Sequence, residues 1–212
     1  MKNLSEWYIR LGVWGLNLFL LNLFWFLFSI VGLFVFGVFP ATVALFTVMR
    51  TLVMEKEEIP LFKLFWRTYK SEFLNSNLIG YLISLFGFIL YIDLRVLQQL
   101  DNSLLHLSLT IMTFVIIFVY FLTLLYLFPV LVHFDLKTFQ YFKYALILAI
   151  GRPFQTLFMI VALAILAFFF MQVPGLIPVF GVSLISLTIM KISSLSFIKK
   201  DITSISSPNL TS

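Results

Sequence analysis

Few residues of this chain are of types that carry out chemistry. It has two histidines and no cysteine. His133 and Asp135 are two residues apart, which on a helix would turn their side chains about 200° away from each other. Neither a His-Glu-x-x-His motif nor a Gly-x-x-x-x-Gly-Lys phosphate loop is present. The sequence therefore predicts a non-enzymatic protein that has no cofactor or metal site and cannot use ATP by itself.

The first apolar stretch contains a polar face. Asn22, Trp25 and Ser29 follow the spacing i, i+3 and i+7, which places them on one side of a helix. Such residues commonly make hydrogen bonds between membrane helices, worth about 1 kcal/mol each. The alternative is that Asn22 and Ser29 form the polar lining of a solute pathway. We favour inter-helix bonding.

A second group of residues suits binding rather than catalysis. Lys63, Arg67 and Lys70 share one side of a predicted helix over residues 61–74, and aromatic residues occupy the other side. This pattern is typical of a helix in the headgroup region of a membrane. A helix that docks a partner protein would have the same pattern. Arg152 is a fourth candidate contact, and attraction of these cations to anionic headgroups, about 1 kcal/mol each, is the favoured interpretation.

Composition explains why these residues sit in such apolar surroundings. The chain has 212 residues, of which 62% are hydrophobic and 11% charged, and its mean hydropathy is +1.09. A soluble domain could not cover so apolar a chain with polar groups, so the solvent must be a bilayer. The apolar stretches have helical length and lack strict alternation, which predicts an all-α polytopic transmembrane helix bundle. In such a protein the net charge of +5 indicates anionic lipid as a partner, not nucleic acid.

We expect one transmembrane domain over residues 1–200 and a flexible polar tail over 201–212. Five spans are predicted, at about 13–39, 78–92, 104–128, 154–173 and 176–195. Interfacial helices are predicted at about 40–54, 61–74 and 130–150. Residues that define breaks or helix starts set these boundaries, namely Gly37, Pro40, Pro129, Gly151 and Pro153. Pro40 and Pro129 also mark a weak internal repeat, in which a span ends in Phe-Pro and an interfacial helix follows.

The distribution of Lys and Arg predicts the orientation. Eleven of the fourteen, including Arg50, fall on the side that follows the first and third spans, and three fall on the other side. The basic side is normally cytoplasmic, so the C-terminus is expected inside and the N-terminus outside the cell. A six-span alternative bends residues 11–54 into a hairpin near residues 29–32. It moves Lys2 and Arg10 inside and so fits the charges slightly better, but no polar turn marks its bend.

Two segments carry a family resemblance. NLFWFLFSIVGLFVF (22–36) with GVFPATVALFTVMR (37–50), and LFPVLVHFDLKTFQYFKYALILAIGRP (127–153), resemble the YesL-like family of bacterial membrane proteins, domain of unknown function 624. The resemblance implies a bacterial cell membrane and a setting beside carbohydrate importers of the ABC class. It implies no biochemical activity.

The expected role is that of an accessory protein in carbohydrate uptake, with ABC permease subunits as partners. The alternatives are a stand-alone channel or carrier for small solutes and a membrane-bound sensor or scaffold.

Overall fold

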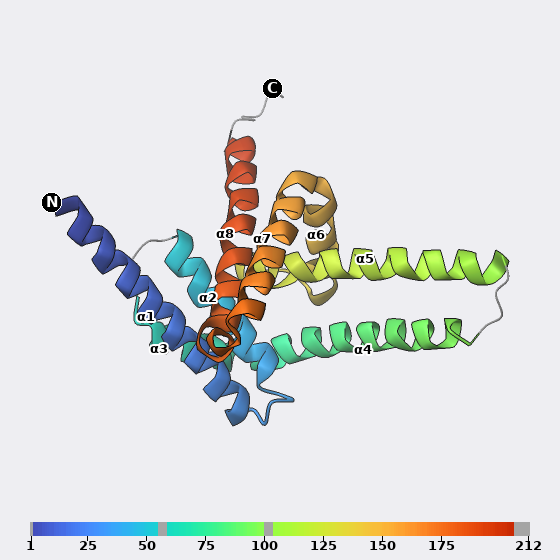
Figure 1. Ribbon diagram of the computed structural model, residues 1–212, viewed down its shortest axis with the longest axis horizontal. Coiled ribbons are helices and arrows are strands. Elements are labelled where there is room, and N and C mark those ends of the chain that lie inside the picture. Colours follow the sequence, from blue (N-terminus) through green and yellow to red (C-terminus); the bar gives the residue numbers. More distant parts are fainter. Residues whose placement is uncertain (1, 55–58, 100–103, 206–212) are drawn as a thin grey trace, which may run out of the picture.

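The computed structural model describes residues 2–54, 59–99 and 104–205, and within these ranges the chain is helical and has no strand. The helices in chain order are α1 (Lys2–Val31), α2 (Val38–Met54), α3 (Leu61–Ser71), α4 (Phe73–Leu97), α5 (Leu104–His133), α6 (Thr138–Gly151), α7 (Pro153–Gln172), the 3₁₀ turn η1 (Pro174–Leu176) and α8 (Ile177–Ile205). Figure 1 shows α4 and α5 as one long antiparallel hairpin, and α7 runs back against α8.

Five of the described segments are long and apolar enough to cross a membrane. They are Leu11–Val31, Phe73–Leu97, Leu104–His133, Pro153–Gln172 and Pro174–Leu195. Many of their large apolar side chains lie on the outer surface; Phe154, for example, is 87% exposed. In water this surface would be unfavourable, whereas lipid tails solvate it. The protein is therefore an all-α, multi-pass membrane protein, as the sequence predicts.

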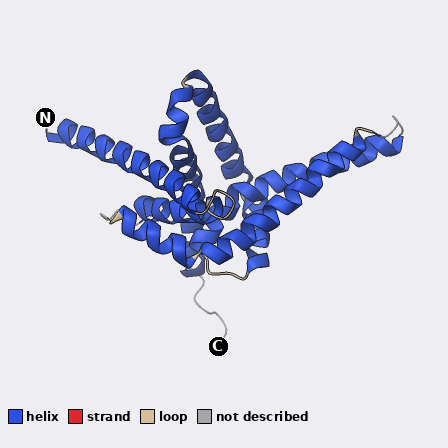
Figure 2. Cartoon of the chain, turned by 90° about the horizontal axis from the view of Figure 1, so that it is seen from below, coloured by secondary structure: helices blue, strands red, loops and turns tan. Residues whose placement is uncertain are grey.

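The centre of the protein is α2. It contacts α1, α3, α4, α5 and α8, and Ala41, Ala44, Val48 and Met49 are fully buried. Figures 1 and 2 show the α4–α5 and α7–α8 hairpins leaving this centre in different directions. The sequence predicts a surface helix over residues 40–54. The structure instead encloses this helix, because its small and apolar side chains pack against neighbours on several sides.

The break after the first span lies earlier than the sequence predicts. The first helix ends at Val31 and not at residue 39, a turn occupies residues 32–37, and Pro40 lies in the first turn of α2. A Cβ on Gly32 would collide with the backbone of Gly37, so the turn requires glycine there. The turn also holds Leu33 at φ 55° and Phe34 at φ 59°, a left-handed conformation that costs roughly 1–2 kcal/mol per residue.

This turn lies just beyond the bend of the six-span alternative. Since α2 has only 17 residues, it is shorter than the roughly 20 that a span requires. The structure thus combines the early bend of that alternative with five candidate spans.

The expected break at Pro129 is wrong. Helix α5 continues through Pro129 to His133, and α6 begins at Thr138 instead of residue 130. Leu127 and Val130, on either side of the proline, are fully buried in the core, and this packing holds the last turns in helical form. Pro40 therefore opens a helix whereas Pro129 lies inside one, so the two prolines do not mark equivalent points of a repeat.

Three further boundaries differ in smaller ways. The helix expected over 61–74 ends at Ser71, and Glu72 alone separates α3 from α4. The span expected over 78–92 runs from Phe73 to Leu97, because the polar residues near its start make hydrogen bonds within the helix and do not end it. Helix α8 continues to Ile205, so residues 201–205 are helical and not a tail, while 206–212 lie outside the described residues.

The predicted stop and restart at residues 151–153 is confirmed. Helix α6 ends at Gly151 and α7 begins at Pro153. Since proline has no N–H, the carbonyl of Ala149 loses its normal helical donor. The hydroxyl of Thr156 donates to this carbonyl at 2.8 Å, and its oxygen lies 3.0 Å from the Tyr126 hydroxyl of α5. One buried threonine thus joins α5, α6 and α7 at the bend.

We expect Thr156→Val to destabilise the protein by about 1–3 kcal/mol, because it leaves the buried Ala149 carbonyl and Tyr126 hydroxyl without their partner. The measurement is SDS-induced unfolding in mixed micelles, followed by far-UV circular dichroism. Thr123→Val is the control, since among the described residues the Thr123 hydroxyl bonds only a carbonyl of its own helix. Equal stability of the two variants would contradict the assignment.

Candidate interaction surface

The Asn22 side chain is committed to a contact between α1 and α8. Its amide nitrogen donates to the carbonyl of Pro178 at 2.7 Å. Its amide oxygen accepts from the backbone N–H of Val182 at 3.0 Å and of Ser183 at 3.3 Å. The Pro178 carbonyl and the Val182 N–H pair with each other in a regular α-helix. Asn22, which is 4% exposed, therefore bridges the first turns of α8.

The other members of the predicted polar face also make bonds within the protein. Trp25 donates its indole N–H to the Thr42 hydroxyl at 3.0 Å, which joins α1 to α2. The Ser29 hydroxyl donates to the Trp25 carbonyl of its own helix at 2.7 Å, and Ser29 is fully buried. The structure thus places Asn22 and Ser29 among packed helices, and their polar atoms face neighbouring backbone.

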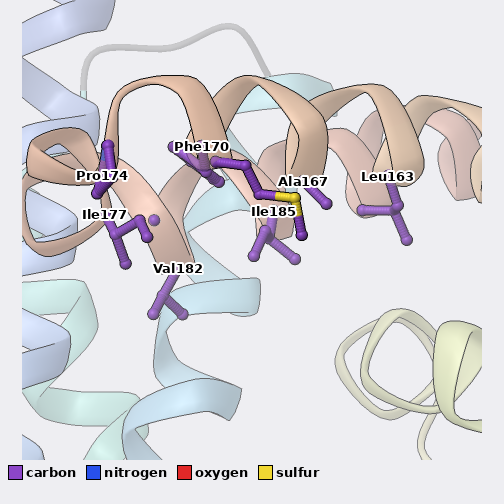
Figure 3. Close-up of a pocket in the computed structure, with 9 residues that line it drawn as sticks. Leu163, Ala167, Phe170, Pro174, Ile177, Val182 and Ile185 are labelled. Atoms are coloured by element: carbon purple, nitrogen blue, oxygen red, sulfur yellow. The ribbon is translucent and has the colours of Figure 1, made fainter.

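An apolar groove lies between α7 and α8 (Figure 3). Its volume is about 590 Å³. The residues that line it are Leu163, Ala167, Phe170, Met171, Pro174, Ile177, Gly181, Val182 and Ile185. None of these side chains offers the hydroxyl, amide or charged group that recognition of a sugar requires. The groove therefore suits hydrocarbon and not a polar solute.

The basic side of α3 is a polar surface that faces outward. Lys63, Arg67 and Lys70 are all exposed, as the helical spacing predicts. The Lys70 ammonium lies 4.3 Å from the ring centroid of Trp66, a cation–π contact. Trp66 is 36% exposed. This side of α3 thus presents positive charge beside an aromatic ring, an arrangement that suits a membrane headgroup region or an acidic partner surface.

Helix α3 is held firmly beneath this surface. The ring of Phe28 in α1 lies 5.2 Å from Phe65 and 5.1 Å from Tyr69, centroid to centroid. The Tyr69 hydroxyl donates to the Phe28 carbonyl at 3.1 Å. Burial raises the pKa of Tyr69, so the hydroxyl remains protonated and a donor at neutral pH. The aromatic side of α3 is thus partly used to attach α3 to α1.

Two of the predicted arginines, Arg50 and Arg152, contact backbone carbonyls of neighbouring helices. The Arg50 guanidinium donates to the Val132 carbonyl at 2.9 Å. This is one of the last carbonyls of α5, and a positive charge at the C-terminal end of a helix interacts favourably with the helix dipole. Arg152 is half-buried and lies 3.4 Å from the Leu195 carbonyl of α8 and 3.5 Å from Gln155. Arg50 is thus an architectural residue, and Arg152 is less accessible than the cations of α3.

The described residues contain no group of three His, Cys, Asp or Glu side chains that could hold a metal ion. Asp93, near the end of α4, accepts a hydrogen bond from the Thr113 hydroxyl at 2.6 Å. This hydrogen bond joins α4 to α5.

Sequence reasoning missed two residues that join helices. The sequence predicts a polar break at Asn77. The structure places Asn77 inside α4, and its amide donates to the Phe36 carbonyl at 2.9 Å. This carbonyl is free because Pro40 has no N–H to donate to it. Thr156 plays the same part for Pro153. The sequence pattern that could have identified both residues is an Asn or Thr in an apolar helix, combined with a proline in the first turn of a helix.

We expect Asn22→Leu to destabilise the protein by about 1–3 kcal/mol, because the contacts from α1 to the backbone of α8 are lost. Asn17→Leu, on the same helix, is the matched control, since Asn17 makes no such contact with α8 among the described residues. Mixed-micelle unfolding of both variants tests this expectation, and an equal effect of the two substitutions would refute the special position of Asn22.

Comparison with known proteins places the chain in a family. Residues 18–94 match the family model described as protein of unknown function, DUF624. In Bacillus subtilis (strain 168), uncharacterized protein YteU is 42% identical over 87% of this chain and 82% of its own length. Uncharacterized protein YesL is 35% identical over 89% and 88%, and uncharacterized protein YesV is 34% identical over 80% and 81%. No solved structure matches. The extent of these similarities shows that the chain belongs to the DUF624 family of YesL-like proteins.

Proposed function

We propose that this protein is a non-enzymatic membrane protein that assists a carbohydrate importer of the ABC class through contacts of its helices. The observation that carries the proposal is the exposed basic side of α3, formed by Lys63, Arg67 and Lys70. It is fixed in place by the aromatic contacts to α1, so it is presented in one orientation. A surface ordered in advance binds a partner at a lower entropic cost.

The link to carbohydrate import rests on the family. The resemblance to YesL-like proteins implies a place beside ABC importers, and permease subunits are therefore the proposed partners. Anionic headgroups are proposed as further partners of the same cations, since lipid attraction and partner docking favour the same charges. The proposed location is the bacterial cell membrane, with the cation-rich side and the C-terminus in the cytoplasm.

The geometry supports a stand-alone channel less well. A polar solute needs a lining of polar groups that are free to replace its water shell. The amide of Asn22 is bound to α8 on both sides, and the α7–α8 groove is apolar. An accessory role requires neither a polar pathway nor a catalytic site.

The test is affinity purification of the tagged protein from its native membrane in a mild detergent, with mass spectrometry of the retained proteins. We expect an ABC permease pair at near-stoichiometric yield. Lys63→Glu/Arg67→Glu reverses the charge of the α3 surface and is expected to lower that yield at least several-fold, because the partner would then meet repulsion instead of attraction.

Lys137→Glu/Lys143→Glu is the matched control. It reverses two cations that are also exposed but belong to another helix: Lys137 immediately precedes α6, and Lys143 lies within it. Loss of the permease with both double variants would indicate a general effect of charge. A protein recovered alone from wild-type membranes would overturn the accessory role, and sugar flux into liposomes that hold only this protein would favour independent transport.

A further inference from the structure

We propose that residues 32–37, called here the apolar turn, lie in the hydrocarbon of the bilayer and not in water. The side chains at its tip are Leu33, Phe34, Val35 and Phe36, which are 77%, 48%, 61% and 50% exposed. The turn contains no charged or polar side chain. A connecting turn that faced water would expose polar groups, and turn sequences in water favour Gly, Asn, Asp and Ser.

Every backbone N–H and carbonyl group of the apolar turn has a hydrogen-bond partner within the protein. All six of its N–H groups donate to backbone carbonyls of the turn or of the end of α1. Four of its six carbonyls accept from backbone N–H groups. The remaining two belong to Val35 and Phe36, and they accept from the Tyr81 hydroxyl and the Asn77 amide of α4, each at 2.9 Å. No backbone group of the turn depends on water.

Complete internal pairing is the condition for irregular backbone at membrane depth. Hydrocarbon offers no hydrogen bonds, so non-helical segments are tolerated there only when the protein supplies every partner. A turn in water has no such requirement, because water could donate to the Val35 and Phe36 carbonyls in place of Tyr81 and Asn77. The pairing and the exposed apolar side chains thus lead independently to the same environment.

The position of the apolar turn beside α4 agrees with this. Asn77 and Tyr81 are four and eight residues into α4, or about 6 and 12 Å along its axis. The Phe36 ring lies 6.1 Å from the Tyr81 ring, centroid to centroid. Because α4 is a candidate membrane span, a segment that packs against its second and third turns lies alongside the span and not beyond its end.

The residue types at the left-handed positions add a final argument. Leu33 and Phe34 have positive φ values, a conformation that Gly and Asn adopt more readily. An aqueous turn would gain from Asn at these positions. Leu and Phe are the better choice only where the side chain contacts hydrocarbon.

A nitroxide spin label on Val35→Cys tests the environment directly. The chain has no native cysteine, so one substitution gives one labelled site. In the purified protein in phosphatidylethanolamine–phosphatidylglycerol liposomes, we expect the label to collide with oxygen several-fold more often than with a neutral nickel chelate. A label on Lys63→Cys, on the basic side of α3, should show the reverse preference. Nickel accessibility at residue 35 equal to that at residue 63 would overturn the proposal, as would protection from both reagents.

A pair of substitutions at Leu33 gives a second test. Both Leu33→Gly and Leu33→Asn relieve the left-handed backbone, but only asparagine adds a polar group. In hydrocarbon, Leu33→Asn should unfold at a lower temperature than Leu33→Gly in the same liposomes. In water the added amide is solvated, so Leu33→Asn would be at least as stable as Leu33→Gly, and this result would refute the proposal.

Discussion

Satisfaction of backbone hydrogen bonds in a medium without water is the constraint on which this structure depends. Prolines and one irregular turn leave carbonyls unpaired where helices begin, and lipid cannot pair them. Side chains from other helices supply the missing donors: Asn77 to Phe36, Tyr81 to Val35 and Thr156 to Ala149. Each such bond also fixes a helix against another helix or against the turn at residues 32–37. The few polar residues of the spans are therefore used mainly for assembly.

This use of polar groups bears on function. Asn22 and Thr156 are each engaged by two or more backbone or hydroxyl partners, so these two side chains serve the contacts between helices. The charged groups of α3 remain outward and anchored through α1. In the proposed role the protein acts by presenting surfaces: its apolar helices contact lipid, and the basic side of α3 contacts lipid headgroups or a partner.

The errors in the predicted boundaries share one cause. A proline has the same local effect wherever it occurs, yet Pro40 opens a helix and Pro129 lies within one. The buried neighbours Leu127 and Val130 hold α5 together around Pro129. The residues near Pro129 in the sequence do not indicate this packing. In the same way, the sequence around Asn77 predicts a polar break. The structure places Asn77 inside α4, where its amide donates to the Phe36 carbonyl.

The sequence by itself determined the solvent, the helical class, the number of long apolar segments and the basic side of α3, because composition and helical spacing are local properties. Only the tertiary structure decided that α2 lies at the centre, that the first helix ends at Val31, and that Asn22 bridges the start of α8. These features depend on pairings between residues up to 161 positions apart, and a hydrogen bond over such a separation has no signature in the spacing of either residue's neighbours.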